Sequence, residues 1–147
     1  MAYSVYTDVT KLLLGMSFSE STGKILTGDI TNIIVDVDNW IDAMLSNYYS
    51  VPITGTESLL IIKIISKYAA AAEVLRRVTA GIQGTKTDNK TGKEYQKRAD
   101  DMLSAIQIGT MELTDATKTN ASNIVRTGKY DATGELRTAK IKIDEVF

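Results

Sequence analysis

Three aspartates close together in the sequence are the first candidates for chemistry: Asp36, Asp38 and Asp42. Carboxylates grouped in this way can bind a divalent cation or share a proton. On a helix, however, only residues three or four positions apart are neighbours, so Asp36 and Asp38 would point in different directions. A calcium-binding loop also fails, because Trp40 stands at the third ligand position and no glycine follows it. The spacing favours a solvent-exposed helix face over a metal or acid–base site.

The chain lacks the two residue types on which most enzyme chemistry near neutral pH depends. Its 147 residues include no histidine and no cysteine. Disulfides, zinc sites built on these residues, thiol nucleophiles and Ser-His-Asp triads are therefore excluded. Neither phosphate-binding pattern, G-x-x-x-x-G-K-[ST] or G-x-G-x-x-G, occurs. We expect no enzymatic activity, no metal and no cofactor.

Three lysines in and after a glycine-punctuated loop are the second candidate. Lys86 and Lys90 lie in the segment 81–92, GIQGTKTDNKTG, and Lys93 follows it directly; Asp88 is the only acid of the segment. In a single copy they would serve solubility, but repeated around a ring they would form a positive collar facing the lumen or the next ring. The whole chain is nearly neutral, with 17 basic against 18 acidic residues. This balance is unlike that of a domain that grips nucleic acid through its phosphates.

The aromatic residues Trp40, Tyr48 and Tyr49 could stack on nucleic-acid bases. Because no arginines are interleaved with them, we interpret them as core or subunit-contact residues.

Four helical segments are expected to carry these residues. A short first helix would start after Ser4 or Thr7 and end before Gly15, and a second would begin near Thr27, whose hydroxyl could cap it. The apolar residues of the second helix step by three or four and form one stripe. They are Ile30, Ile33, Ile34, Val37, Ile41, Met44, Leu45 and Tyr48. Pro52 ends this segment, since it lacks an N–H and disfavours helical geometry before it.

The third helix, from about Glu57 to Ala80, is apolar on nearly all sides in its first half and alanine-rich in its second. Such a helix is expected at the centre of a bundle, and we predict Leu60, Ile64 and Ile65 to be core residues. A fourth helix is predicted from about Thr91 to Gly109.

After Gly109 the helical periodicity fails, and only 139–147 recover a pattern. Ile141 and Ile143 alternate there with Lys140 and Lys142, as in an exposed strand. A single strand is not stable alone, so this end is expected to add to a partner sheet or to another chain. The predicted arm-binding residues are Lys140, Ile141, Lys142, Ile143, Val146 and Phe147. The fold class expected is mainly α: a small bundle of about four helices, with an extended C-terminal arm able to form a short β element.

Targeting signals are not evident. The first residues carry no basic region, and the apolar run Leu12–Leu14 is too short for a signal sequence. The most apolar stretch, 59–75, is interrupted by Lys63, Lys67 and Glu73 and is not expected to span a membrane. We expect a protein of the reducing cytoplasm.

Two motifs in succession resemble a known family. The first is Asp38-x-x-Ile41-x-x-x-Leu45-x-x-Tyr48-Tyr49-x-Val51-Pro52. After the long apolar helix with Tyr68 comes the second, Tyr95-x-x-x-Ala99-x-x-x-Leu103-x-x-Ile106-x-x-Gly109-x-x-x-Leu113. Over residues 3–114 this order resembles the head-tail connector, or head-completion adaptor, proteins of tailed bacteriophages.

The resemblance implies a non-enzymatic adaptor whose copies form a ring, commonly a dodecamer, beneath the portal protein. Such a ring extends the channel through which genomic DNA passes and offers a surface to the stopper or tail-completion protein. The protein would be made in the host cytoplasm and would reside in the virion, at the head-tail interface. It further implies a helical adaptor domain at 1–114 and, at 115–147, an arm that holds the portal or a neighbouring subunit. The alternatives are another small helical interaction or assembly module and, less favoured by the charge, a nucleic-acid-binding regulator.

Overall fold

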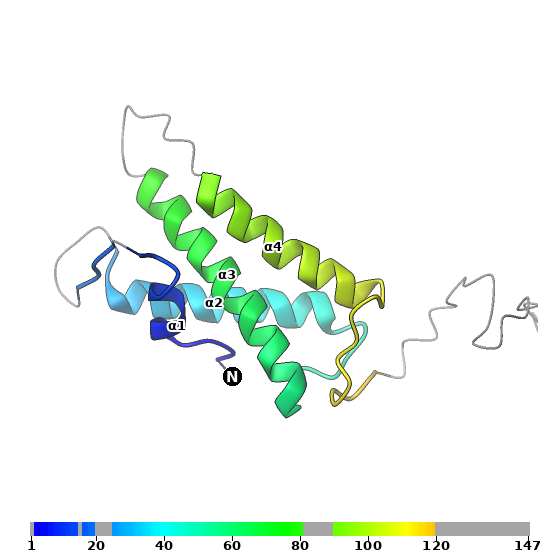
Figure 1. Ribbon diagram of the computed structural model, residues 1–147. Helices are drawn as coiled ribbons and strands as arrows, with labels where there is room; N and C mark the ends of the chain where they lie inside the picture. Colours follow the sequence, from blue (N-terminus) through cyan, green and yellow to red (C-terminus); the bar gives the residue numbers. More distant parts are fainter. Residues whose placement is uncertain (1, 15, 20–24, 81–89, 120–147) are drawn as a thin grey trace, which may run out of the picture.

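The computed structural model describes residues 2–14, 16–19, 25–80 and 90–119, and these form a small helical bundle. Its helices are α1 (Tyr6–Thr10), α2 (Thr27–Leu45), α3 (Thr56–Ala80) and α4 (Lys90–Gln107). Helix α3 crosses α2, and α4 lies alongside α3 (Figure 1). The mainly α fold predicted from the sequence is confirmed. None of these helices is long and apolar enough to cross a membrane.

The predicted apolar stripe of α2 forms much of the core. Ile30, Ile33, Ile41 and Leu45 are essentially inaccessible to solvent, whereas Met44 at the margin of the stripe is exposed. Helix α2 begins at Thr27, close to the predicted position, but its N-cap residue is not the one predicted. Leu26 is the N-cap residue, and its backbone N–H donates to the Asp29 carboxylate at 2.8 Å. The prediction of a Thr27 hydroxyl cap was therefore wrong, because Thr27 is already the first helical residue.

The central position predicted for α3 is confirmed, but of its three predicted core residues only Ile65 belongs to a buried cluster. Ile65 is fully buried and Ile64 is partly buried, whereas the side chain of Leu60 is 62% exposed. Helices α1, α2 and α4 all pack on α3, and none of them covers the side that carries Leu60. Helical periodicity shows that a helix is apolar all round, but it does not show which sides have neighbours.

Helix α4 ends at the predicted glycine. Gly109 has a φ of 77°, a conformation in which a side chain is disfavoured, and its N–H donates to the carbonyl of Ile106. The N–H of Met111 then donates to the Ala105 carbonyl at 3.0 Å, which turns the chain back toward the bundle. Leu113 is buried in the core as a result.

Residues 115–119, which we expected to belong to the arm, lie against the bundle. The Asp115 carboxylate accepts hydrogen bonds from the backbone N–H groups of Glu57 and Ser58, at 2.8 and 2.9 Å, and so caps the N-terminus of α3. Beyond it, Tyr49 and Lys118 form an isolated antiparallel bridge. The described chain thus stays on the bundle as far as Thr119, and the rest of the predicted arm, 120–147, lies outside the described residues.

Two glycine-to-alanine substitutions are expected to have opposite effects on stability, because only Gly55 lies against the capping residue Asp115. A Cβ at Gly55 would lie 2.6 Å from the Asp115 backbone oxygen and would overlap its carboxylate, so Gly55→Ala is expected to destabilise by about 1–3 kcal/mol. At Gly28, a helical residue of α2, a Cβ meets nothing within 4 Å. Gly28→Ala should therefore raise stability by about 0.5–1 kcal/mol. Urea unfolding measures both, and equal effects would contradict the cap geometry.

Candidate interaction surfaces

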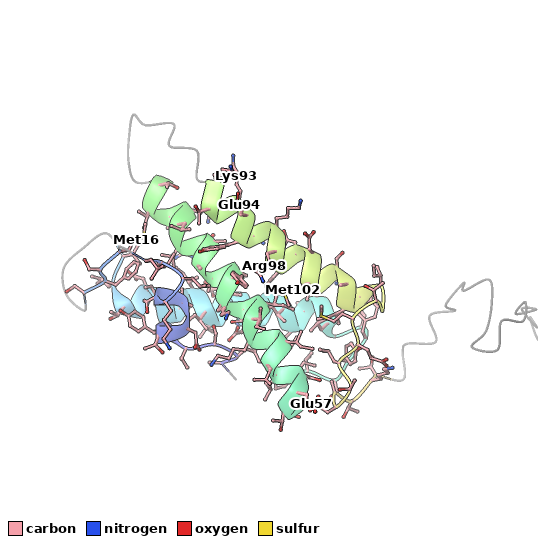
Figure 2. All side chains as sticks on the ribbon, viewed as in Figure 1. Met16, Glu57, Lys93, Glu94, Arg98 and Met102 are labelled. Atoms are coloured by element: carbon pink, nitrogen blue, oxygen red, sulfur yellow. The ribbon has the colours of Figure 1, made fainter. Side chains whose placement is uncertain are left out.

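The predicted lysine site falls at the start of α4. Lys90 and Lys93 are exposed in the first turn of the helix, which contains no acidic residue. The exposed Glu94 follows directly, and Figure 2 shows it beside Lys93. The N-terminus of a helix is already the positive end of its dipole, so lysines there do not stabilise the helix. The third lysine of the predicted site, Lys86, lies outside the described residues.

The predicted arm residues all lie outside the described residues: Lys140, Ile141, Lys142, Ile143, Val146 and Phe147. The structure does show where the chain leading to them leaves the bundle. The backbone N–H of Thr119 donates to the Tyr48 carbonyl at 3.1 Å, and the Thr119 hydroxyl donates to the Asn47 carbonyl. The root of the arm is thereby fixed beside the C-terminal end of α2.

The lysines and the root of the arm lie at opposite ends of the bundle. Helix α4 has 18 residues and is therefore about 27 Å long. Lys90 and Lys93 are in its first turn, whereas the segment that leads to Thr119 follows its last turn (Figure 1). The molecule thus has two exposed lysines at one end and a continuing chain at the other.

The aspartate triplet is divided between solvent and core, which corrects the interpretation of a uniformly exposed face. Asp36 is exposed, but Asp38 is only 3% exposed and is enclosed by hydrogen-bond donors. Its carboxylate accepts from the backbone N–H of Tyr3 at 2.7 Å and from the Ser66 hydroxyl at 2.6 Å. Ser66 shares a further hydrogen bond of 2.7 Å with the hydroxyl of Ser4.

The Tyr3 hydroxyl extends this network to a second aspartate and to the turn after α2. It donates to the Asp42 carboxylate and accepts from the backbone N–H of Ile53 at 2.8 Å. Burial and the neighbouring Asp42 raise the pKa of Tyr3 well above its usual range. Desolvation likewise raises the pKa of Asp38, against the opposing effect of its hydrogen bonds from Ser66 and Tyr3.

This network holds the N-terminal segment on α2 and α3 rather than exposing a reactive group. Both carboxylate oxygens of Asp38 accept hydrogen bonds from within the chain, and the residue is buried. Within the described part of the chain, no group of three or more acidic side chains could hold a metal ion. The helical spacing of Asp38 and Asp42 could have suggested that they act together, but Tyr3, 35 residues away, carries no sequence signal for this contact.

The aromatic residues divide between core and surface. Tyr49 is buried, whereas Trp40 and Tyr48 are partly exposed. Trp40 lines a shallow groove of about 200 Å³ in which the side chains of α2, α3 and α4 meet. Glu73 and Arg77 line the same groove and form an ion pair of 2.7 Å. Hydrogen bonds from Arg76 and, to a smaller extent, Arg77 lower the pKa of Glu73.

A partly exposed surface along α3 and α4 is not evident from the sequence. Two cations lie over the ring of Tyr68: the Arg98 guanidinium at 4.6 Å and the Lys67 ammonium at 5.5 Å from the ring centroid. Figure 2 shows Arg98 and Met102 along the seam between the two helices. Leu60 and Ile64 continue this surface on α3. We call it the α3–α4 face: Leu60, Ile61, Ile64, Lys67, Tyr68, Arg98 and Met102.

Comparisons with protein families, curated proteins and solved structures found no significant match to this chain.

Proposed function

We propose that this protein is a structural adaptor of a tailed-bacteriophage virion, without enzymatic activity. Copies of it would form a ring, commonly a dodecamer, beneath the portal protein and link the capsid to the stopper or tail-completion protein. The observation that carries the proposal is the polarity of the bundle, with exposed lysines at one end and the root of the arm at the other. An adaptor needs two different ends because it joins two different partners.

The charge of the chain supports this role. A channel must let genomic DNA pass without gripping it, and affinity for phosphates rises with the number of basic contacts. A subunit with 17 basic and 18 acidic residues satisfies this requirement, whereas a DNA-binding regulator needs a basic surface. The exposed lysines at the start of α4 would then act at long range, as a positive collar facing the lumen or the next ring.

The arm would provide the attachment. Beyond Thr119, the chain still has 28 residues, which include the alternating Ile141 and Ile143. An extended peptide that adds to a sheet edge gains affinity from main-chain hydrogen bonds and specificity from alternate side chains. We propose that this segment binds the portal or a neighbouring subunit. The protein would be made in the host cytoplasm and incorporated at the head-tail interface.

The test is to mix the purified full-length protein with portal rings from the same source and to determine the mass of the product by native mass spectrometry. The comparator should end at Thr119. A chain ending at 114 would also remove Asp115, which caps α3, and would confuse loss of binding with loss of folding. We expect a discrete ring on the portal with the full-length chain and none with the 1–119 chain.

Unfolding of both chains in urea provides the control, and their midpoints should agree. If the full-length chain does not associate with the portal, the adaptor proposal is wrong and another helical assembly module becomes the better description. If the 1–119 chain binds as well as the full-length chain, the adaptor role stands but the proposed role of the arm is wrong.

A further inference from the structure

The groove beside Trp40, which we call the Trp40 groove, has an apolar lining. It lies where side chains of α2, α3 and α4 meet and has a volume of about 200 Å³. The buried Ile33 and Ala69 line it together with the partly exposed Val37 and Trp40. Because an apolar cavity of about 150 Å³ accommodates a benzene molecule, this groove has room for one or two aliphatic side chains.

The Trp40 groove also has the length of a short extended peptide. Ala69 and Arg77 both line it, and they are about 12 Å apart along α3. About four residues of an extended chain span the same distance. Alternate side chains of such a peptide point to the same side, so two of them would face the groove.

Charged side chains of both signs stand at the rim of the groove. Asp36 is exposed there and forms no ion pair with another described residue. Glu73 accepts hydrogen bonds from both Arg76 and Arg77, so this cluster has one positive charge in excess. The rim therefore suits an occupant that carries a basic and an acidic residue beside its apolar ones.

The segment 140–145 of the same chain has this composition. Its sequence is KIKIDE, which places Ile141 and Ile143 on one side of an extended chain, with lysines before them and acidic residues after them. The segment can reach the groove of its own copy. Trp40 lies about 12 Å along α2 from the Tyr48 carbonyl that holds Thr119, and the connection 120–139 can span up to about 66 Å.

We propose that the segment 140–145 binds in the Trp40 groove of its own copy and that the portal competes for it. Ile141 and Ile143 pack against Trp40, Lys142 lies near Asp36, and the acidic end of the segment lies near Arg77. The contact covers the two isoleucines until a sheet edge of the portal takes them. The competition rests on the proposed function, whereas the contact itself does not.

The contact is expected to be weak enough for the portal to displace. A tethered segment has an effective concentration on the order of 1 mM, so a contact with a Kd of about 1 mM is formed in about half of the molecules. An occupancy of this size changes the free energy of unfolding little, and the full-length and 1–119 chains should still unfold at similar urea concentrations.

Trp40 is the only tryptophan of the chain, so its fluorescence reports on the groove. In the full-length Ile141→Ser/Ile143→Ser variant, acrylamide should quench Trp40 about 1.5-fold more efficiently than in the wild type, because the groove is then empty. The matched control is Leu136→Ser, which removes an apolar side chain outside the segment and should leave the quenching unchanged. Equal quenching in the wild type and the double variant would contradict the contact.

The absence of cysteine in the chain allows a second test. Gln96→Cys, at the rim of the groove, and Ala139→Cys are placed in one full-length chain and treated with a short bis-maleimide crosslinker. We expect a crosslink within the monomer at every protein concentration, and less of it when portal rings are added. In the control, Leu60→Cys replaces Gln96→Cys. Leu60 is exposed on the side of α3 opposite Ala69, so this pair should crosslink several-fold less.

Two crosslinking results would overturn the inference. One is equal crosslinking of Ala139→Cys to Gln96→Cys and to Leu60→Cys. The other is a crosslink that forms only between copies when the two single variants are mixed, which would show that the segment binds a second copy. If the portal binds but neither test shows the contact, this inference is wrong while the proposed function stands. If the contact is found but the portal does not bind, the contact stands and the proposed function fails.

Discussion

Replacing Asp38 with alanine is expected to lower the free energy of unfolding by about 2–4 kcal/mol. The carboxylate is 3% exposed and accepts hydrogen bonds from the Tyr3 backbone and the Ser66 hydroxyl. Without it, the backbone N–H of Tyr3 would remain buried and unpaired, the Ser66 hydroxyl would keep only its hydrogen bond with Ser4, and the N-terminal segment would lose one of its attachments to α2 and α3. Relief of the cost of burying the carboxylate offsets only part of this loss.

The matched control for this substitution is Asp36→Ala. Asp36 is on the same helix two residues away and is exposed, so its substitution should change stability by no more than about 0.5 kcal/mol. Urea unfolding at neutral pH and low protein concentration measures both variants. Equal effects would mean that the Asp38 network contributes nothing beyond an ordinary helix position.

The pH dependence of stability gives a second readout of Asp38. Burial raises its pKa in the folded state, so the folded protein binds this proton more tightly than the unfolded chain does. The contribution of Asp38 to the free energy of unfolding therefore falls as the pH rises from its unfolded pKa of about 3.9 to its folded pKa, and is constant above that. In Asp38→Asn, whose amide does not titrate, this part of the pH dependence should disappear.

Replacing Ile65 with alanine is expected to cost about 2–5 kcal/mol. Its side chain is fully buried in the cluster that joins α3 to α2 and α4. Truncation removes buried apolar surface and leaves a cavity that the surrounding helices fill only in part. The melting temperature and the urea midpoint should both fall clearly.

Leu60→Ala is the control for Ile65→Ala on the same helix. With 62% of its side chain exposed, Leu60 contributes little to folding, and the loss should remain below about 1 kcal/mol. The measurement requires a concentration at which sedimentation shows a monomer, so that any contact between copies does not contribute. Similar losses for the two variants would contradict the orientation of α3.

Much of the fold could be predicted from local sequence patterns. The stepping of the apolar residues by three or four located α2, and the conformational freedom of Gly109 marked where α4 ends. Pro52 separated α2 from α3 because it cannot continue a helix. These features depend on residues within one or two turns of each other, so a linear sequence displays them directly.

The candidate surfaces required contacts between distant parts of the chain. Lys90 and Lys93, predicted as part of a lysine loop, lie in the first turn of α4, and the exposure of Leu60 on α3 was not foreseen, because Leu60 looked like a core residue. The resemblance of residues 3–114 to connector proteins supplied a role for the arm, and this role still depends on the portal experiment.

By itself, the sequence determined the helical class, the positions of the breaks, and the absence of histidine and cysteine chemistry. Only the tertiary structure decided that Asp38 is buried under Tyr3, and that Asp115 caps α3 from 57 residues downstream. It also decided which side of α3 none of the described helices covers. The physical reason is that burial and capping depend on which distant segment packs against a residue. Periodicity shows only on which side of its own helix a residue lies.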